Sequence, residues 1–243
     1  MVGVPSERLR ITGVSWAEWT RGIEVEPSLY ASDLSRLAEE VETLLAAGTR
    51  VFHWDVGDGH FIPPITMGPI VLQAISPLVH AAGGVLDCHL MVAAPERHIT
   101  QFAEAGADSV TVHVEVCPDP TEVVGLAREH GLEAGLSLNP ETSIEQVATA
   151  ALEAEVDLVL CMSVHPGYSG QKFIPDAFER IRALRELLPG SMRIQVDGGV
   201  GLENIAELHE AGATLFVAGA SVFGHEDRGA AYRALVEQAT RET

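Results

Sequence analysis

Short apolar runs rich in β-branched residues alternate along this chain with longer segments in which apolar residues recur at helical spacing. A short apolar run bounded by turn residues predicts a buried strand, and apolar residues three and four positions apart predict an amphipathic helix. The predicted strands cover residues 24–28, 51–56, 85–90, 109–114, 134–138, 157–163, 193–197 and 214–218. A helical pattern follows each of them, so the chain divides into eight successive strand–helix units.

The ends of the helical segments carry their own signals. The first predicted helix spans residues 33–47, with Asp33 as its N-cap and Gly48 as its stop. Three stretches repeat a glycine that ends a helix shortly before the next strand: AAGTR at 46–50, EAGADSV at 104–110 and EAGATLF at 210–216. A short loop with glycine just past the helix explains this spacing.

Eight strand–helix units in one chain predict an α/β fold, a (β/α)8 TIM barrel that forms a single domain over residues 24–243. A doubly wound sheet is the alternative, but such a sheet more often has about five or six strands. Residues 1–23 stand outside the pattern and are read as a short N-terminal extension. Within it, Trp16 and Trp19 predict packing onto the barrel or onto a neighbouring subunit.

Composition narrows the possible partners. The 243 residues are 47% hydrophobic, which is enough for a substantial core, and 35 acidic against 15 basic residues give a net charge of −20. Such a surface repels nucleic acid and anionic lipid. No apolar run approaches the roughly 18 residues that span a bilayer, and the first residues lack a secretory pattern. The predicted compartment is therefore the cytoplasm, with no nucleic acid or membrane as partner.

Polar residues interrupt the predicted strands where their carboxyl ends would form one rim of the barrel. Strand 2 carries His53 and Asp55 two positions apart, strand 3 carries His89, strand 7 ends at Asp197 and strand 1 at Ser28. Enzymes of this fold build their sites at that rim. Two imidazoles and two carboxylates can bind one divalent metal ion such as Zn, Fe, Mn or Co.

Glycine-rich stretches follow the last three predicted strands: HPGYSGQKF at 165–173, DGGVG at 197–201 and GASVFG at 219–224. Glycine lets the main chain approach a ligand closely, and barrels favour the loops after strands 7 and 8 for phosphate. Three such loops on one rim predict a phosphate site.

The stretches VEPSLYASDLSRLAEEV, FHWDVGDGHFIPPITMGP, LDCHLMV, MSVHPGYSGQKF and IQVDGGVGLEN resemble the successive signatures of ribulose-phosphate 3-epimerases. The resemblance runs from about residue 24 to the C-terminal helix. It implies a phosphorylated ketose as substrate, one divalent metal, no organic cofactor and a homo-oligomer. His53, Asp55, His89 and Asp197 match the metal ligands, with Asp55 as proton acceptor, Asp197 as donor and the roles exchanged in reverse.

The same resemblance assigns substrate contacts to matching positions on several strand ends and loops: Ser28, His89, Met91, Met162, Gly167, Tyr168, Ser169, Gly170, Gly198, Gly199, Gly219 and Ala220. The chemistry is inversion at C3 beside a C2 ketone through an enediolate. Two carboxylates on opposite faces can remove a proton and return one, whereas a single base tends to return it to the same face.

The sequence departs from the family pattern at Gly57, where a lid methionine is usual, and at His165, where Asn, Asp or Glu is common. Pro64 and Ser169 also differ from the family, and Ala220-Ser221 reverses the usual order. None of these positions belongs to the metal shell. Gly57 predicts open space beside the reacting carbons, so a longer substrate, a hexulose 6-phosphate or a heptulose 7-phosphate such as sedoheptulose 7-phosphate, is the alternative to a pentulose phosphate.

Two other classes of function are alternatives to an epimerase. A Schiff-base aldolase needs a lysine at a strand end, but Lys172, the only lysine, lies well into the loop after strand 6. A non-catalytic barrel that binds sugar phosphate is disfavoured by the intact pair of aspartates and pair of histidines.

Overall fold

A computed structural model describes residues 15–20 and 22–241, and within these ranges eight strands form one sheet. The strands are β1 (Glu24–Pro27), β2 (Val51–Gly57), β3 (Val85–Met91), β4 (Ser109–His113), β5 (Glu133–Leu138), β6 (Leu158–Met162), β7 (Arg193–Asp197) and β8 (Leu215–Ala218). Every predicted strand is present, and each of its ends lies within one residue of the prediction.

All the strand pairs are parallel and run in the order β1-β8-β7-β6-β5-β4-β3-β2. The two ends of this sheet meet, because a parallel bridge joins Ser28, just after β1, to His53 of β2. The predicted TIM barrel is therefore confirmed, and the doubly wound sheet is excluded. Closure brings β2, β3 and β7 around one interior, although they are far apart in the sequence.

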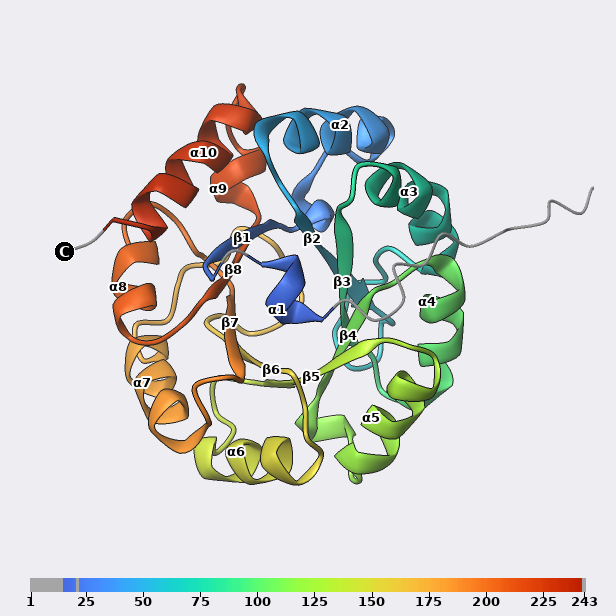
Figure 1. Cartoon of the computed structure of the whole chain (residues 1–243), viewed down its shortest axis with the longest axis vertical. Coiled ribbons are helices and arrows are strands. Elements are labelled where there is room, and N and C mark those ends of the chain that lie inside the picture. The colour runs from blue at the N-terminus through green and yellow to red at the C-terminus, as the bar shows by residue number, and fades with distance from the viewer. Residues whose placement is uncertain (1–14, 21, 242–243) are drawn as a thin grey trace, which may run out of the picture.

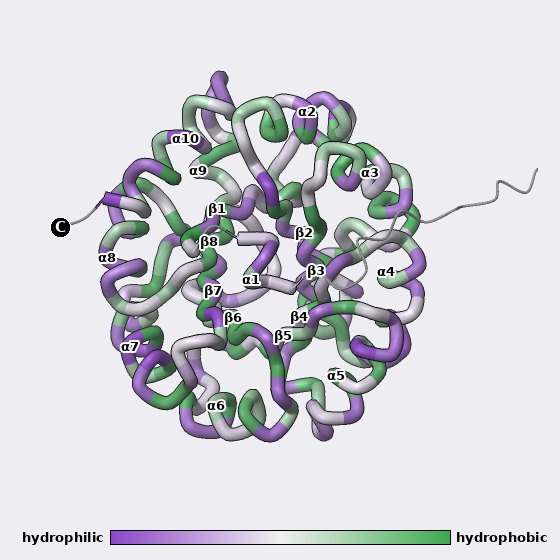
Figure 2. The backbone as a smooth tube through the Cα atoms, in the orientation of Figure 1, coloured by the Kyte–Doolittle hydropathy of each residue, from purple (hydrophilic) through white to green (hydrophobic). Residues whose placement is uncertain are grey.

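Helices surround the barrel in the order in which they follow the strands, as Figure 1 shows. They are α2 (Leu37–Ala47), α3 (Pro69–Ala81), α4 (Ile99–Ala105), α5 (Pro120–Glu129), α6 (Ile144–Glu153), α7 (Ala177–Leu187), α8 (Ile205–Glu210), α9 (Ala220–Phe223) and α10 (Arg228–Ala239). Short 3₁₀ turns lie at Leu29–Ala31, Leu34–Arg36, Pro95–Arg97 and Val114–Val116. Hydrophobic and hydrophilic positions alternate along these helices, so one face of each can pack on the sheet (Figure 2). Among the described residues, none of the helices is long and apolar enough to cross a membrane.

The helix α1 (Trp16–Trp19) lies across one opening of the barrel in Figure 1. Trp16 and Trp19 are buried and belong to a hydrophobic cluster with residues from the first positions of several strands, among them Val51, Val85 and Leu215. Their predicted packing onto the barrel is thus confirmed, and it closes the end opposite the carboxyl ends of the strands. The boundary between an extension over 1–23 and a barrel domain over 24–243 stays a prediction.

The first helix begins later than predicted. Asp33 caps the 3₁₀ turn Leu34–Arg36, since its Oδ1 accepts hydrogen bonds from the main-chain N–H and the hydroxyl of Ser35. The helix α2 itself begins at Leu37. Its predicted end is confirmed, because Gly48 has a φ of 105° and donates its N–H to carbonyls of the last turn.

Candidate active site

Four side chains converge at the carboxyl ends of β2, β3 and β7: His53, Asp55, His89 and Asp197. Side chains two apart on a strand share one face, so His53 and Asp55 both face the barrel interior. Oδ1 of Asp55 lies 3.4 Å from Nε2 of His53 and 3.4 Å from Nδ1 of His89. Oδ2 of Asp197 lies 3.9 Å from the same Nδ1 of His89. One potential ligand atom from each of the four side chains lies within 4.8 Å of the others.

Three atoms at the centre of this group are buried without a hydrogen-bond partner: Nε2 of His53, Oδ1 of Asp55 and Nδ1 of His89. An unpartnered buried polar atom is costly, so three of them facing one another indicate a ligand. Two imidazole nitrogens and two carboxylate oxygens are a donor set that Zn²⁺, Fe²⁺, Mn²⁺ and Co²⁺ accept. The cluster therefore fits the divalent metal that the sequence predicts.

The two carboxylates have different electrostatic surroundings. Burial opposes ionisation of Asp55, but the imidazoles of His53 and His89 outweigh it and hold the pKa of Asp55 well below its ordinary range. Burial, followed by the nearby charge of Asp55, raises the pKa of Asp197 to about 7. Without a metal, Asp55 is thus ionised near neutral pH, whereas Asp197 takes up its proton close to neutral pH.

A second polar layer lies beneath His53. Its Nδ1 is 3.0 Å from Oδ2 of Asp87 and 3.8 Å from Oε2 of Glu26. Gln195 donates hydrogen bonds to both carboxylates, at 2.5 Å to Glu26 and 2.8 Å to Asp87. Glu26, Asp87 and Gln195 were not singled out from the sequence. Each lies two positions before a predicted site residue, which is Ser28 for Glu26, His89 for Asp87 and Asp197 for Gln195.

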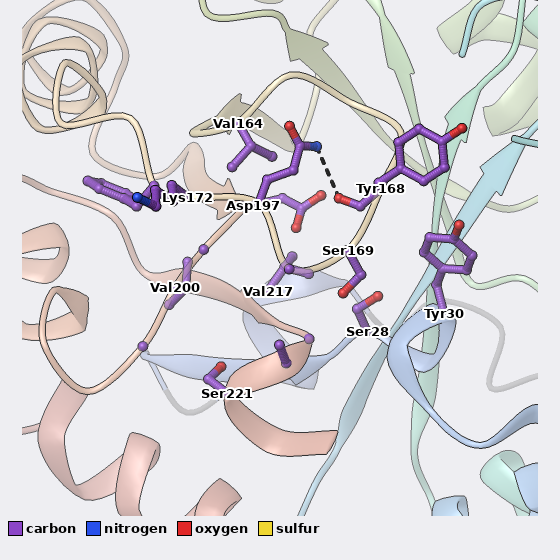
Figure 3. Close-up of a pocket in the computed structure, with 18 of the residues that line it drawn as sticks. Ser28, Tyr30, Val164, Tyr168, Ser169, Lys172, Asp197, Val200, Val217 and Ser221 are labelled. Carbon is purple, nitrogen blue, oxygen red and sulfur yellow. Dashed lines mark hydrogen bonds between the residues drawn. The ribbon is translucent and has the colours of Figure 1, made fainter. Parts of the chain in front are cut away.

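A cavity of about 990 Å³ opens above the cluster, between the loops that follow β1, β6, β7 and β8. In Figure 3, Tyr30 and Tyr168 stand on one side of it and Lys172 on the other, with Ser28 and Ser169 between them. Gln171 donates a hydrogen bond of 3.0 Å to the carbonyl of Tyr168, which braces the loop after β6. Tyr30 was not singled out from the sequence, although it lies within the stretch VEPSLYASDLSRLAEEV that carries the family resemblance.

Most of the predicted substrate contacts line this cavity. They are Ser28, Met91, Met162, Gly167, Tyr168, Ser169, Gly170, Gly198, Gly199, Gly219 and Ala220, together with Asp55 and Asp197. His53 and His89 are fully buried and do not line it. Three of the chain's predicted glycine loops thus meet at one cavity wall, although they come from different strands.

The expectation of open space at Gly57 is wrong. A Cβ added there would lie 2.6 Å from Cδ1 of Ile62 and 2.6 Å from the carbonyl oxygen of Pro64. The loop after β2 folds back over Gly57, held by the bridge between Asp58 and Ile65, and buries Ile62 in that space. Gly57 does not line the cavity and does not enlarge it.

His165, the second specificity candidate, also lies outside the cavity lining. Its Nε2 is 2.6 Å from Oε1 of Glu141, and both side chains are largely exposed. This contact directs the ring toward the turn before α6 and away from the cavity, so the residue does not contact a ligand there. Val164 and Pro166, its neighbours in the sequence, do line the cavity.

A closed barrel with paired carboxylates and imidazoles around a cavity at the carboxyl ends of its strands has the architecture of a barrel enzyme. A family model described as the ribulose-phosphate 3 epimerase family matches residues 24–223. The chain belongs to this family, and it is an isomerase that acts as a ketose-phosphate 3-epimerase. The reading as a non-catalytic barrel is therefore not retained.

Curated relatives support the family over most of their length. The chain is 40% identical over 210 residues to a ribulose-phosphate 3-epimerase of Bacillus subtilis, which covers 85% of this chain and 94% of that protein. It is 41% identical over 215 residues to the cytoplasmic isoform of ribulose-phosphate 3-epimerase from Oryza sativa subsp. japonica, and the match covers 87% of this chain and 92% of that protein. A solved structure of KGPDC from Streptococcus mutans in complex with D-R5P has a TM-score of 0.71 at 15% identity, covering 89% and 97%, and this likeness concerns the fold alone.

Proposed function

We propose that this epimerase interconverts D-ribulose 5-phosphate and D-xylulose 5-phosphate by proton transfer at C3 between two aspartates. The observation that carries the proposal is the position of Asp55 and Asp197. They come from β2 and β7, line one cavity, and each has a carboxylate oxygen within 3.9 Å of Nδ1 of His89. Two carboxylates reach a substrate carbon from two sides, which inversion requires and a single base does not provide.

Asp55 accepts the C3 proton and Asp197 donates one, and the roles are exchanged in the reverse direction. Ser28 donates a hydrogen bond of 2.6 Å to Oδ2 of Asp55, which orients this carboxylate and leaves its Oδ1 facing the two histidines. A divalent metal held by His53, Asp55, His89 and Asp197 would supply Lewis-acid stabilisation of the negative charge that develops on the substrate as an enediolate.

The phosphate of the substrate is assigned to the wall formed by the loops after β6, β7 and β8. Glycines at Gly167, Gly170, Gly198, Gly199 and Gly219 expose the main chain to the cavity there. Phosphate sites of this fold are frequently built from the loops after strands 7 and 8. Lys172 adds a cationic side chain to the same cavity in a strongly acidic protein.

Incubation of metal-replete protein in D₂O with ribulose 5-phosphate tests the proposal. Deuterium at C3 and the appearance of xylulose 5-phosphate, followed by NMR, are the expected results. Parallel incubations with a hexulose 6-phosphate and sedoheptulose 7-phosphate measure chain-length preference. A preference for a longer ketose would overturn the assigned substrate, and the absence of exchange with all three would overturn the assigned chemistry.

Ile62 removes the structural reason for a longer ketose, so no second substrate is proposed. The identity of the metal, the absence of an organic cofactor, homo-oligomer assembly and the cytoplasmic location stay predictions.

A further inference from the structure

A chain of three side chains leads from the candidate metal cluster toward the surface. Nε2 of His89 lies 2.8 Å from Nε2 of His113 on the neighbouring strand β4. Nδ1 of His113 lies 3.1 Å from Oε2 of Glu115, in the 3₁₀ turn that follows β4. Both imidazoles are fully buried, whereas Glu115 is partly exposed. Nothing in the proposed proton transfer uses His113 or Glu115.

The contact between the two Nε2 atoms restricts where protons can lie. At 2.8 Å it is a hydrogen bond, so one nitrogen donates and the other accepts. A neutral imidazole carries one proton, on one of its two nitrogens. The location of the proton on either ring therefore decides its location on the other.

Glu115 breaks the symmetry of this pair. Burial opposes ionisation of Glu115. Hydrogen bonds from His113, the main chain of Asn139 and Thr142 outweigh burial and lower the pKa of this carboxyl to about 2, so it is ionised. An ionised carboxylate only accepts hydrogen bonds, so Nδ1 of His113 must carry the proton that Oε2 of Glu115 accepts. Nε2 of His113 is then bare and accepts a hydrogen bond from Nε2–H of His89. It follows that Nδ1 of His89 carries no proton, and this is the unpartnered atom that faces Asp55 and Asp197.

We infer that Glu115 is a positioning residue which, through His113, keeps the Nδ1 lone pair of His89 free to bind the divalent cation. The inference rests on the metal site proposed above and adds to it the residues that set the tautomer of one ligand. Metal-bound histidines commonly donate their second N–H to a carboxylate or carbonyl, and loss of that partner weakens metal binding. His53 has such a carboxylate directly, in Asp87, whereas His89 reaches one only through a second imidazole.

His89, His113 and Glu115 form a relay of hydrogen bonds, and the second oxygen of Glu115 allows this relay to be tested with an isosteric substitution. Oε1 accepts the main-chain N–H of Asn139 at 2.8 Å and the hydroxyl of Thr142. A main-chain N–H can only donate, so in a Glu115→Gln variant the amide oxygen must take the Oε1 position. The amide nitrogen then faces Nδ1 of His113 and donates to it. Every proton along the relay is reversed, and Nδ1 of His89 becomes protonated.

Cobalt(II) binding, measured by competition with a chromophoric chelator at pH 7.5, is the first readout. Glu115→Gln is expected to lower the affinity for Co²⁺ by about 10–100-fold, the usual effect of losing the outer partner of a histidine ligand. Glu141→Gln is the matched control, because Glu141 also contacts a histidine, His165, but in an exposed pair outside the cavity. Its affinity should equal that of the unaltered protein.

The second readout needs no variant and covers the case in which Glu115→Gln does not fold. Long-range ¹H–¹⁵N correlation spectra of the metal-free protein should show the proton of His113 on Nδ1 and that of His89 on Nε2. The opposite tautomers, or an unchanged Co²⁺ affinity in a folded Glu115→Gln protein, would overturn the relay while leaving the metal site intact. Failure of the unaltered protein to bind Co²⁺ would overturn the proposed metal site and the relay with it.

Discussion

Gly57→Ala tests whether Ile62 fills the space that the family's lid methionine leaves. The new Cβ would lie 2.6 Å from Cδ1 of Ile62 and from the carbonyl oxygen of Pro64, which is 0.8 Å inside the 3.4 Å at which ordinary contact begins. Overpacking of this kind costs about 1–3 kcal/mol. In a domain of this size each kcal/mol lowers the melting temperature by about 2–4 °C, so a fall of roughly 2–12 °C is expected.

A double-mutant cycle separates the two contacts. Ile62 is 2% exposed, so Ile62→Ala alone should cost about 2–5 kcal/mol through the cavity it leaves. In the double variant the new methyl group enters that cavity, and the combined cost should be smaller than the sum by about 0.5–3 kcal/mol. Truncation of Ile62 should relieve the overpacking at residue 57 only in part, because the carbonyl oxygen of Pro64 stays close to the new Cβ.

Equilibrium unfolding in urea, followed by far-ultraviolet circular dichroism, measures the four free energies of unfolding. Additivity of the two substitutions within about 0.5 kcal/mol would refute the reasoning, since it would mean that Ile62 does not occupy the volume at Gly57. A stable Gly57→Ala protein with a changed preference for ketose length would refute it in another way, by showing that Gly57 borders the substrate.

Asp197→Asn should reduce C3 proton exchange in D₂O by about 10²–10⁴-fold, and exchange at the unaltered rate would exclude Asp197 as an acid or base. Removal of metal with a chelator should lower the melting temperature, with recovery on adding Co²⁺, because a cation at 100 times its Kd stabilises the folded state by about 2.7 kcal/mol. Burial and the charge of Asp157 raise the pKa of Glu133 from 4.5 to about 7, so the folded state binds this proton more tightly than the unfolded state. The free energy of unfolding should therefore fall as the pH rises from 4.5 to 7, and Glu133→Gln should make this fall smaller. Urea titrations at several pH values measure it, and an equal dependence on pH in the two proteins would contradict the assignment. His165→Ala should leave KM for the ketose phosphate unchanged, since its ring pairs with Glu141 outside the cavity, and a clear rise in KM would contradict this placement.

Periodicity alone was enough to locate the strands of this protein, because a strand buried inside a ring of helices must be apolar along most of its length. The rule that barrel sites lie at the carboxyl ends of strands then places His53, Asp55, His89 and Asp197 at one rim from the sequence alone. Residues two apart on one strand share a face, which is a local property and can be read without knowing the rest of the fold.

Contacts between distant segments could not be read in this way. Ile62 fills the space at Gly57 because the loop after β2 folds back over it. His165 contacts Glu141 because the turn between β5 and α6 lies beside the loop after β6. The relay from His89 through His113 to Glu115 requires the register between β3 and β4, which the pattern of apolar residues leaves open. The positions of the chemical groups follow from local alternation, whereas their partners and protonation depend on packing between elements that only the closed barrel brings together.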